Sequence, residues 1–372
     1  MSFSFGFANA ELSDDELLPT PFVADNEGVQ ERPNTLANPL DAEWLKSTDI
    51  PQPAVVPLDK LLESLDDVRL SFEEVQTPQQ AIKLFRRELF DVKHQLMSED
   101  NAESDSPDQR AELDILMGET NEDVRKNVYE GGLKSWECSL DLVDFLSSQG
   151  PKSWPRVAEL GCGTALPSQY IFSQYLRQES HLGLRLLLSD YNESVLRLAT
   201  LPNLIIAWAK QVLSQEQWAA LQQTRDENIA IMEDELQLTQ ELLSAFRDDL
   251  KQKNIELYFI SGTWSRSFLD LLKEIGWTPS PELLLLTSET IYQPETLPVI
   301  AELLLELISE SLRGGYPFKA YTAAKDIYFG VGGSVAEFEQ YVSSKTRERS
   351  LPLQLTTHKV NAGLKRSIVA IE

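Results

Sequence analysis

Short, continuous apolar runs alternate with helical patterns through the last two thirds of the chain. Seven runs are too uniformly apolar for a sheet wetted on one face, and they predict strands buried on both faces. These runs lie at residues 157–160, 184–189, 255–260, 283–287, 318–323, 353–357 and 364–371. Apolar positions at three- and four-residue spacing predict helices between most of them. These helical patterns lie at residues 167–176, 193–199, 267–275, 295–312 and 335–343.

The regular alternation of strand and helix predicts an α/β fold with a mostly parallel sheet. The last two strands are separated by a short connection, which predicts an antiparallel hairpin at one edge. Residues 201–254 do not fit the alternation, because they hold a further long helical stretch that includes LTQELLSAFRDDLKQ. We expect them to form an insertion between the second helix and the third strand.

The first third of the chain differs in composition. Prolines are interleaved with Asp, Glu and Asn over residues 8–58, and such a segment buries too little apolar area to offset its ordering entropy. Residues 1–57 are therefore predicted to be disordered. Helical spacing at 58–65 and 81–96, followed by an acidic linker at 98–110, predicts a helical extension over 58–119 that packs on a main domain at 120–372.

Charge narrows the choice of partners. The chain has 33 Lys and Arg against 59 Asp and Glu, a net charge of −26, and residues 1–120 alone hold 26 acidic and 9 basic side chains. A surface this negative disfavours direct nucleic-acid binding, which relies on Lys and Arg. A basic protein is the natural electrostatic complement.

Few other classes of site find support. The sequence lacks a leader-like segment and an apolar run long enough to cross a membrane, so we expect an intracellular protein without a membrane span. Cys138 and Cys162 are the two cysteines, and the three histidines lie far apart in the sequence. We expect no metal site.

The strongest local signal is RVAELGCGTALPS at residues 156–168. It reads as a strand, a tight turn through Gly161 and Gly163, and the start of a helix, an arrangement that lets backbone amides approach a nucleotide-like ligand. Dinucleotide-binding enzymes use a similar turn, so the pattern alone is ambiguous. Here Ala165 stands near the place of the third glycine, Glu159 precedes the turn, and Asp190 ends the second strand.

Neighbouring segments make the assignment more specific. The chain contains VYEGGLKSWECSLDLVDFL at 128–146, ELGCG at 159–163, SDYNESVL at 189–196, ISGTWS at 260–265 and LTSETIY at 286–292. Together they resemble the histidine protein methyltransferase family of eukaryotes, in its fungal branch. The resemblance implies a class I, Rossmann-like seven-strand fold with S-adenosyl-L-methionine as cofactor. It also implies methylation of one histidine, at the tele nitrogen, in a large-subunit ribosomal protein. Separately, we expect the enzyme to be a monomer in the cytoplasm and the nucleus.

The same resemblance assigns a set of cofactor-binding residues. They are Ser135, Trp136, Glu137, Cys138 and Ser139 at the methionine end, Glu159, Gly161 and Gly163 at the turn, Asp190, Tyr191 and Asn192 at the ribose, Gly262, Thr263 and Trp264 at the adenine, and Ser288 near the methyl group. We further expect Glu289 or Tyr292 to hold the proton of the acceptor imidazole, because both follow the fourth strand.

Two other functions remain compatible with the sequence. The chain could be a non-catalytic acidic escort for basic ribosomal proteins, or it could methylate lysine or arginine. Labelled methyl transfer to purified ribosomal proteins, followed by amino-acid analysis of any product, distinguishes all three.

Overall fold

The computed structural model describes residues 37–100, 130–150, 152–177, 183–222, 232–328, 330–360 and 364–372. The chain divides into residues Met1–Ala37 and a compact unit, Asn38–Glu372. The predicted linker at 98–110 lies almost wholly outside the described residues, as do the predicted disorder before residue 37 and the end of the extension.

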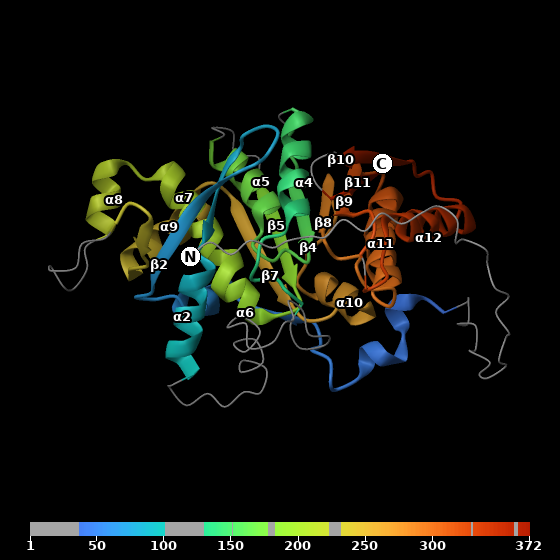
Figure 1. Cartoon of the computed structure of the whole chain (residues 1–372), viewed down its shortest axis with the longest axis horizontal. Coiled ribbons are helices and arrows are strands. Elements are labelled where there is room, and N and C mark those ends of the chain that lie inside the picture. The colour runs from blue at the N-terminus through green and yellow to red at the C-terminus, as the bar shows by residue number, and fades with distance from the viewer. Residues whose placement is uncertain are drawn as a thin grey trace, which may run out of the picture. The chain divides into compact units, whose positions relative to one another are not determined.

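One eight-stranded sheet forms the centre of the compact unit (Figure 1). Its strand order is β1-β7-β5-β4-β8-β9-β11-β10. The strands are β1 (Ala54–Val55), β4 (Arg156–Leu160), β5 (Leu184–Asp190), β7 (Ile255–Ser261), β8 (Leu283–Ser288), β9 (Phe318–Lys325), β10 (Leu355–Val360) and β11 (Arg366–Ile371). All seven predicted strands are present, and β7, β5, β4, β8 and β9 are parallel.

Both ends of the sheet carry antiparallel strands. β10 and β11 form the predicted edge hairpin, and β11 lies between β9 and β10, antiparallel to both. At the other edge, the short strand β1 pairs antiparallel with β7. β1 was not predicted from the sequence.

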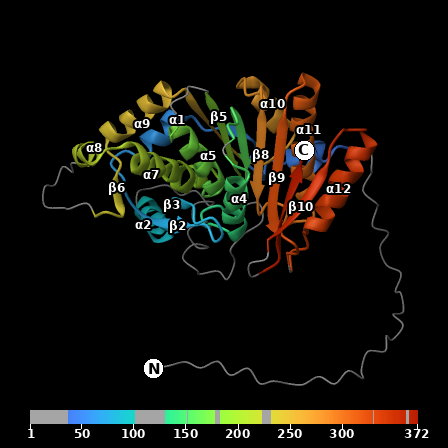
Figure 2. The same cartoon turned by 90° about the horizontal axis from the view of Figure 1, so that it is seen from above.

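Helices cover both faces of the sheet, as the apolar runs required (Figure 2). Within β4, Val157 packs in the hydrophobic cluster on one face of the sheet, whereas its neighbour Ala158 packs in the cluster on the other face. The helices on the first face are α4 (Glu137–Ser148), α5 (Leu166–Arg177), α7 (Leu201–Val212), α9 (Gln240–Gln252) and the short α1 (Leu58–Glu63). Those on the second are α10 (Arg266–Glu274), α11 (Leu297–Gly314) and α12 (Val335–Glu348).

The insertion begins inside a continuous helix. α6 (Glu193–Val195) passes through a π-helical turn, Leu196–Thr200, directly into α7. The predicted end of this helix at residue 199 is therefore wrong, since the helix continues through α7, in which residues 201–209 are all buried. The insertion continues with α8 (Gln215–Leu221), β6 (Glu235–Gln237) and α9 before β7.

A second, three-stranded sheet of order β3-β2-β6 joins the insertion to the N-terminal region. Its strands β2 (Arg69–Gln76) and β3 (Lys83–Arg87) precede α2 (Leu89–Asp100). The helix predicted over 81–96 is thus wrong in its first half. Pairing with β2, which local spacing cannot reveal, makes residues 83–87 a strand.

Disorder was also predicted too far along the chain. Residues 38–56 are ordered and contain two 3-10 helices, η1 (Pro39–Asp41) and η2 (Glu43–Lys46), before β1. Leu40 and Leu45 are each only 1% exposed and pack in the cluster with α11. Burial of these two leucines helps to offset the entropy cost of ordering the segment. The proline-rich composition suggested that this cost would keep the segment disordered.

None of the described helices is long and apolar enough to cross a membrane. The described residues also contain no group of three or more His, Cys, Asp or Glu side chains that could hold a metal ion.

Candidate active site

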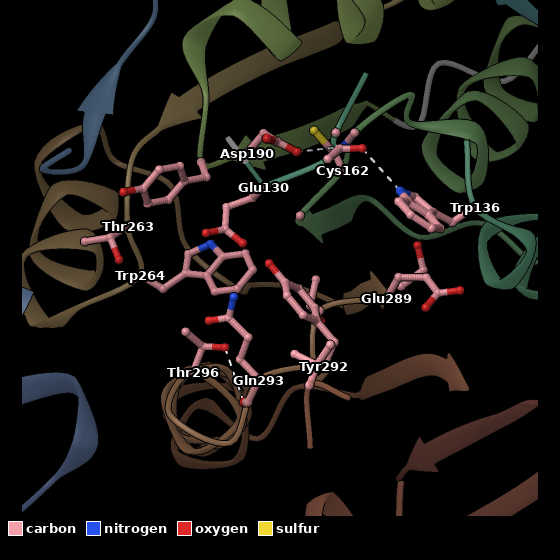
Figure 3. Close-up of a pocket in the computed structure, with 18 of the residues that line it drawn as sticks. Glu130, Trp136, Cys162, Asp190, Thr263, Trp264, Glu289, Tyr292, Gln293 and Thr296 are labelled. Carbon is pink, nitrogen blue, oxygen red and sulfur yellow. Dashed lines mark hydrogen bonds between the residues drawn. The ribbon is translucent and has the colours of Figure 1, made fainter. Parts of the chain in front are cut away.

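A cavity of about 310 Å³ opens at the carboxyl ends of β4, β5, β7 and β8 (Figure 3). This is where an open α/β sheet binds its ligands. Twelve of the seventeen predicted site residues line it: Trp136, Ser139, Gly161, Gly163, Asp190, Tyr191, Gly262, Thr263, Trp264, Ser288, Glu289 and Tyr292. Trp136 and Glu289 lie at one end of the cavity in this view, and Thr263 and Trp264 lie at the other.

The glycine turn between β4 and α5 forms the floor. Gly161 and Gly163 have φ of +68° and +50°, in the left-handed region that favours glycine. A Cβ on Gly161 would lie 2.5 Å from the Thr290 methyl carbon, so a side chain there would collide with the cavity wall. Ala165 adopts the same left-handed conformation without being glycine, with φ of +54°.

Asp190 ends β5 directly beside this turn. Its Oδ2 accepts a hydrogen bond of 2.8 Å from the N–H of Gly163, which fixes the carboxylate at the cavity wall. Burial raises the pKa of Asp190 to about 6, and the backbone hydrogen bonds from Gly163 and Asn192 oppose that rise. The carboxylate can therefore accept hydrogen bonds at neutral pH.

Glu159 is fully buried behind the turn and is not part of the cavity wall. Its Oε2 accepts a hydrogen bond of 2.9 Å from the N–H of Ser168, and its Oε1 has no hydrogen-bond partner. Burial raises the pKa of Glu159 to about 8. The geometry therefore gives Glu159 a place beneath the turn and the start of α5.

Trp136 precedes α4 and forms the wall at the opposite end from Trp264. Its indole Nε1 donates a 3.2 Å hydrogen bond to the carbonyl of Gly131, and the Lys325 ammonium lies 5.2 Å from the ring centroid. One face of the ring therefore already has a cation over it. Ser135, one residue earlier, bonds the Thr164 hydroxyl at 2.9 Å rather than lining the cavity.

The remaining predicted residues also lie off the cavity wall. Glu137 is exposed, Cys138 is fully buried within α4, and Asn192 accepts a hydrogen bond of 3.3 Å from the N–H of Glu130. Burial and the neighbouring Glu289 raise the pKa of the Cys138 thiol, and burial raises that of Cys162. Neither thiol is a nucleophile at neutral pH.

Residues 262–264 form the wall after β7. Gly262 has φ of +100° and donates its N–H to the carbonyls of Asp190 and Tyr191. The indole Nε1 of Trp264 lies 3.3 Å from the Ser189 hydroxyl and donates to it. The turn therefore places an aromatic plane beside the end of β5.

Glu289 directly follows β8 with a left-handed φ of +58°, a strained conformation for a residue other than glycine. Its carboxylate accepts a 2.5 Å hydrogen bond at Oε2 from the Tyr328 hydroxyl. The other oxygen, Oε1, is buried without a hydrogen-bond partner, and the Lys325 ammonium lies 4.0 Å from it. The carboxylate is fixed by one oxygen and has acceptor capacity at the other.

The structure adds wall residues that the motifs did not indicate. Lys325 and Tyr328 come from the end of β9 and the loop that follows, while Trp44 and Ile50 come from the N-terminal segment. The first pair could have been anticipated, because β9 is parallel to β8 and ends at the same edge of the sheet. No sequence signal pointed to the second pair.

The fold and the cavity together define a class I methyltransferase that uses S-adenosylmethionine. Seven strands in the order β7-β5-β4-β8-β9-β11-β10, with β11 antiparallel, carry a glycine turn after β4 and a buried carboxylate at the end of β5. These residues suit the cofactor, since Asp190 offers a fixed acceptor for a vicinal diol and Gly161 leaves the backbone open to close approach.

Comparison with known proteins is more specific. The chain is 52% identical to histidine protein methyltransferase 1 of Saccharomyces cerevisiae over 100% of this chain and 98% of that protein. It is 34% identical to the Schizosaccharomyces pombe protein of the same name over 76% of this chain and 75% of the other, and 29% identical to a Rattus norvegicus homolog over 67% and 59%. The chain belongs to the histidine protein methyltransferase family.

Two other comparisons add little. No family model matches the sequence. A solved ribosomal protein L11 methylase from Lactobacillus delbrueckii subsp. bulgaricus aligns with 67% of this chain and 88% of its own, at 12% identity and a TM-score of 0.32, a similarity too low to inform on function.

Proposed function

We propose that this protein transfers the methyl group of S-adenosylmethionine to the tele nitrogen of a histidine in a large-subunit ribosomal protein. The observation that carries the proposal is the Glu289 carboxylate. It is held by Tyr328 at the end of β8, with its second oxygen lacking a hydrogen-bond partner. Such an acceptor suits the N–H of a neutral imidazole.

The cofactor residues fall into three groups along the cavity. Asp190 would accept from the ribose hydroxyls, and the turn through Gly161 and Gly163 would lie against the ligand backbone. Tyr191 and the turn at 262–264 would flank the adenine, with Trp264 offering a plane for stacking. Trp136 would face the sulfonium, which supplies an electrophilic methyl with a good leaving group.

The acceptor histidine needs orientation more than activation. Imidazole has a reference pKa of about 6.5, so much of it is neutral at cellular pH and carries a lone pair on one ring nitrogen. Glu289 would accept the N–H of the other nitrogen and so turn the lone pair toward the methyl group. Once the ring is methylated and cationic, the same carboxylate can take up the remaining N–H proton.

The charge of the chain supports a basic protein as substrate. Acidic side chains outnumber basic ones by 26, and ribosomal proteins are the class of basic partner that the family resemblance indicates. We also propose that the enzyme acts as a monomer in the cytoplasm and the nucleus.

Labelled methyl transfer to purified large-subunit ribosomal proteins tests the proposal. Amino-acid analysis of the product should give tele-methylhistidine in a single protein. The pros isomer would contradict the assigned nitrogen, and methylated lysine or arginine would contradict the acceptor. Failure to transfer any label, with the cofactor bound, would favour a non-catalytic escort.

A further inference from the structure

The N-terminal segment at residues 38–56, here called the strap, is anchored on the second face of the sheet. Leu40 and Leu45 are buried beside α11, and the Arg266 guanidinium pairs with both Asp41 oxygens at 3.0 and 3.1 Å. The Gln52 side-chain amide lies 3.0 to 3.2 Å from the carbonyls of Leu45, Ser47 and Ile50, to which it donates. The strap therefore has a defined path.

That path runs along the turn after β7. The N–H of Thr263 donates to the carbonyl of Pro51 at 2.9 Å, and β1 pairs with the end of β7 through Ala54 and Ser261. A Cβ on Gly262 would lie 2.4 Å from the Gln52 carbonyl oxygen. The strap and the turn thus approach as closely as they do only because residue 262 is glycine.

Two strap side chains face the cavity from this position. Ile50 directly precedes the residue that bonds Thr263, and it lines the cavity while being only 7% exposed. Trp44 also lines the cavity but is 40% exposed, although Leu45 beside it is buried. The ordered strap, which bonds Thr263 through the carbonyl of Pro51, therefore also brings an aromatic side chain to the cavity wall.

We propose that Trp44 and Ile50 form the outer wall of the adenine end of the cofactor site. Adenine has two apolar faces, and aromatic or aliphatic side chains on both sides remove them from water. Tyr191 follows β5 and Trp264 follows β7, and both line the cavity. The strap would add a wall that does not come from the sheet. This assignment rests on the part of the proposed function that locates adenine at the turn after β7.

Binding measurements on the full-length protein test the wall directly. Trp44→Ala and Ile50→Ala should each weaken S-adenosylmethionine binding, and Trp44→Ala by at least about tenfold, the scale of losing one stacking partner. 5′-Methylthioadenosine has the adenine but lacks the amino-acid end, so its affinity should fall by the same factor. Trp44→Phe should recover most of the affinity because it keeps an aromatic face.

Phe90→Ala is the matched control, because Phe90 is a 76% exposed aromatic residue on α2 that does not line the cavity. It should bind both ligands as wild type does. Unchanged affinities in Trp44→Ala and Ile50→Ala would overturn the assignment. If these variants then raised the KM for the protein acceptor, the strap would contact the acceptor rather than the cofactor. A wild-type protein that binds neither ligand would overturn the proposed function together with this inference.

Hydrogen exchange gives a second readout that does not depend on a variant folding. The N–H groups of Val56 and Thr263 hold the strap to β7 and its turn. If the strap is a wall of the cofactor site, S-adenosylmethionine should slow exchange at both amides. Exchange rates that the cofactor leaves unchanged would contradict the proposal.

Discussion

At the scale of single residues, three carboxylates in or behind the cavity wall have sharply different environments. Asp190 is fixed by a backbone amide at the turn, Glu159 is sealed behind it, and Glu289 is held by a tyrosine hydroxyl at the opposite end. Burial and hydrogen bonding, rather than residue type, therefore decide which of them can bind, orient or only support.

The orienting role of Glu289 predicts a specific kinetic defect. Glu289→Gln should lower kcat by about 100-fold or more, the scale of a positioned proton acceptor, while the Kd for S-adenosylmethionine stays unchanged. Tyr328→Phe should lower kcat less, because it frees the carboxylate without removing it, and Tyr292→Phe tests the other predicted acceptor. Glu274→Gln is the control, since Glu274 is exposed on α10 and off the cavity wall. Wild-type turnover in Glu289→Gln would exclude the role.

Glu159 predicts a dependence of stability on pH. Its pKa is raised from 4.5 to about 8, so between these values the folded protein binds more protons than the unfolded chain. Its contribution to the free energy of unfolding is therefore full below pH 4.5 and is lost as pH rises through 8. Each tenfold difference in proton affinity between the folded and unfolded states corresponds to about 1.4 kcal/mol.

Glu159→Gln cannot ionise at this position, so the variant should not lose this stabilisation as pH rises. The free energy of unfolding of Glu159→Gln, relative to that of wild type, should therefore increase from pH 4.5 to pH 8. Urea denaturation at both ends of the window measures the difference. Glu216→Gln, at an exposed position on α8, is the control. A constant difference between Glu159→Gln and wild type would show that Glu159 is not buried as a neutral acid.

At the scale of elements, continuous apolar runs predicted the central strands because burial on both faces leaves a signal in the local sequence. The segment at 81–96 failed because Ile82, Phe85 and Leu89 fit helical spacing, while the pairing that makes β3 a strand comes from β2. In the same way, the motifs located the walls from β4, β5, β7 and β8. Lys325 and Tyr328 follow from the parallel course of β9 beside β8, whereas Trp44 reaches the cavity only through the tertiary contacts of the N-terminal segment.

The side chain of Gln169 links helix α5, which packs on the central sheet, to strand β3 of the three-stranded sheet. Gln169 is 1% exposed, and its side chain accepts from the N–H of Phe85 at 2.8 Å and donates to the carbonyl of Phe85 at 2.6 Å, as a neighbouring strand would. Gln169→Met should leave both groups of β3 buried and unpaired, at about 1 to 3 kcal/mol each.

Urea unfolding measures this cost, and hydrogen exchange at Phe85 locates it. Gln174→Met on the same helix gives a comparison at a position that makes no such bonds to β3. Equal stability of Gln169→Met and wild type would mean that water replaces the amide at this site.

At the scale of the whole molecule, charge is the dominant property, and it is concentrated toward the N-terminus. With 26 acidic against 9 basic side chains over residues 1–120, that region can act as a counter-charge for a basic substrate. The competing explanation is that the charge serves solubility alone.

Salt distinguishes the two. If the acidic region attracts the substrate, the KM for the protein acceptor should rise severalfold between about 50 and about 300 mM salt, because screening shortens the reach of exposed charges. The Kd for S-adenosylmethionine serves as the internal control and should change little. A salt-independent KM would leave solubility as the explanation.

The cavity also has a consequence for how the chain is made. Its walls draw on Trp44 near one end of the sequence and on Lys325 and Tyr328 near the other, so its contact order is high. A nascent chain must emerge almost entirely from the ribosome before the pocket can close. The cofactor therefore cannot assist the early steps of folding. It can stabilise the folded protein by binding to it only after synthesis has passed β9.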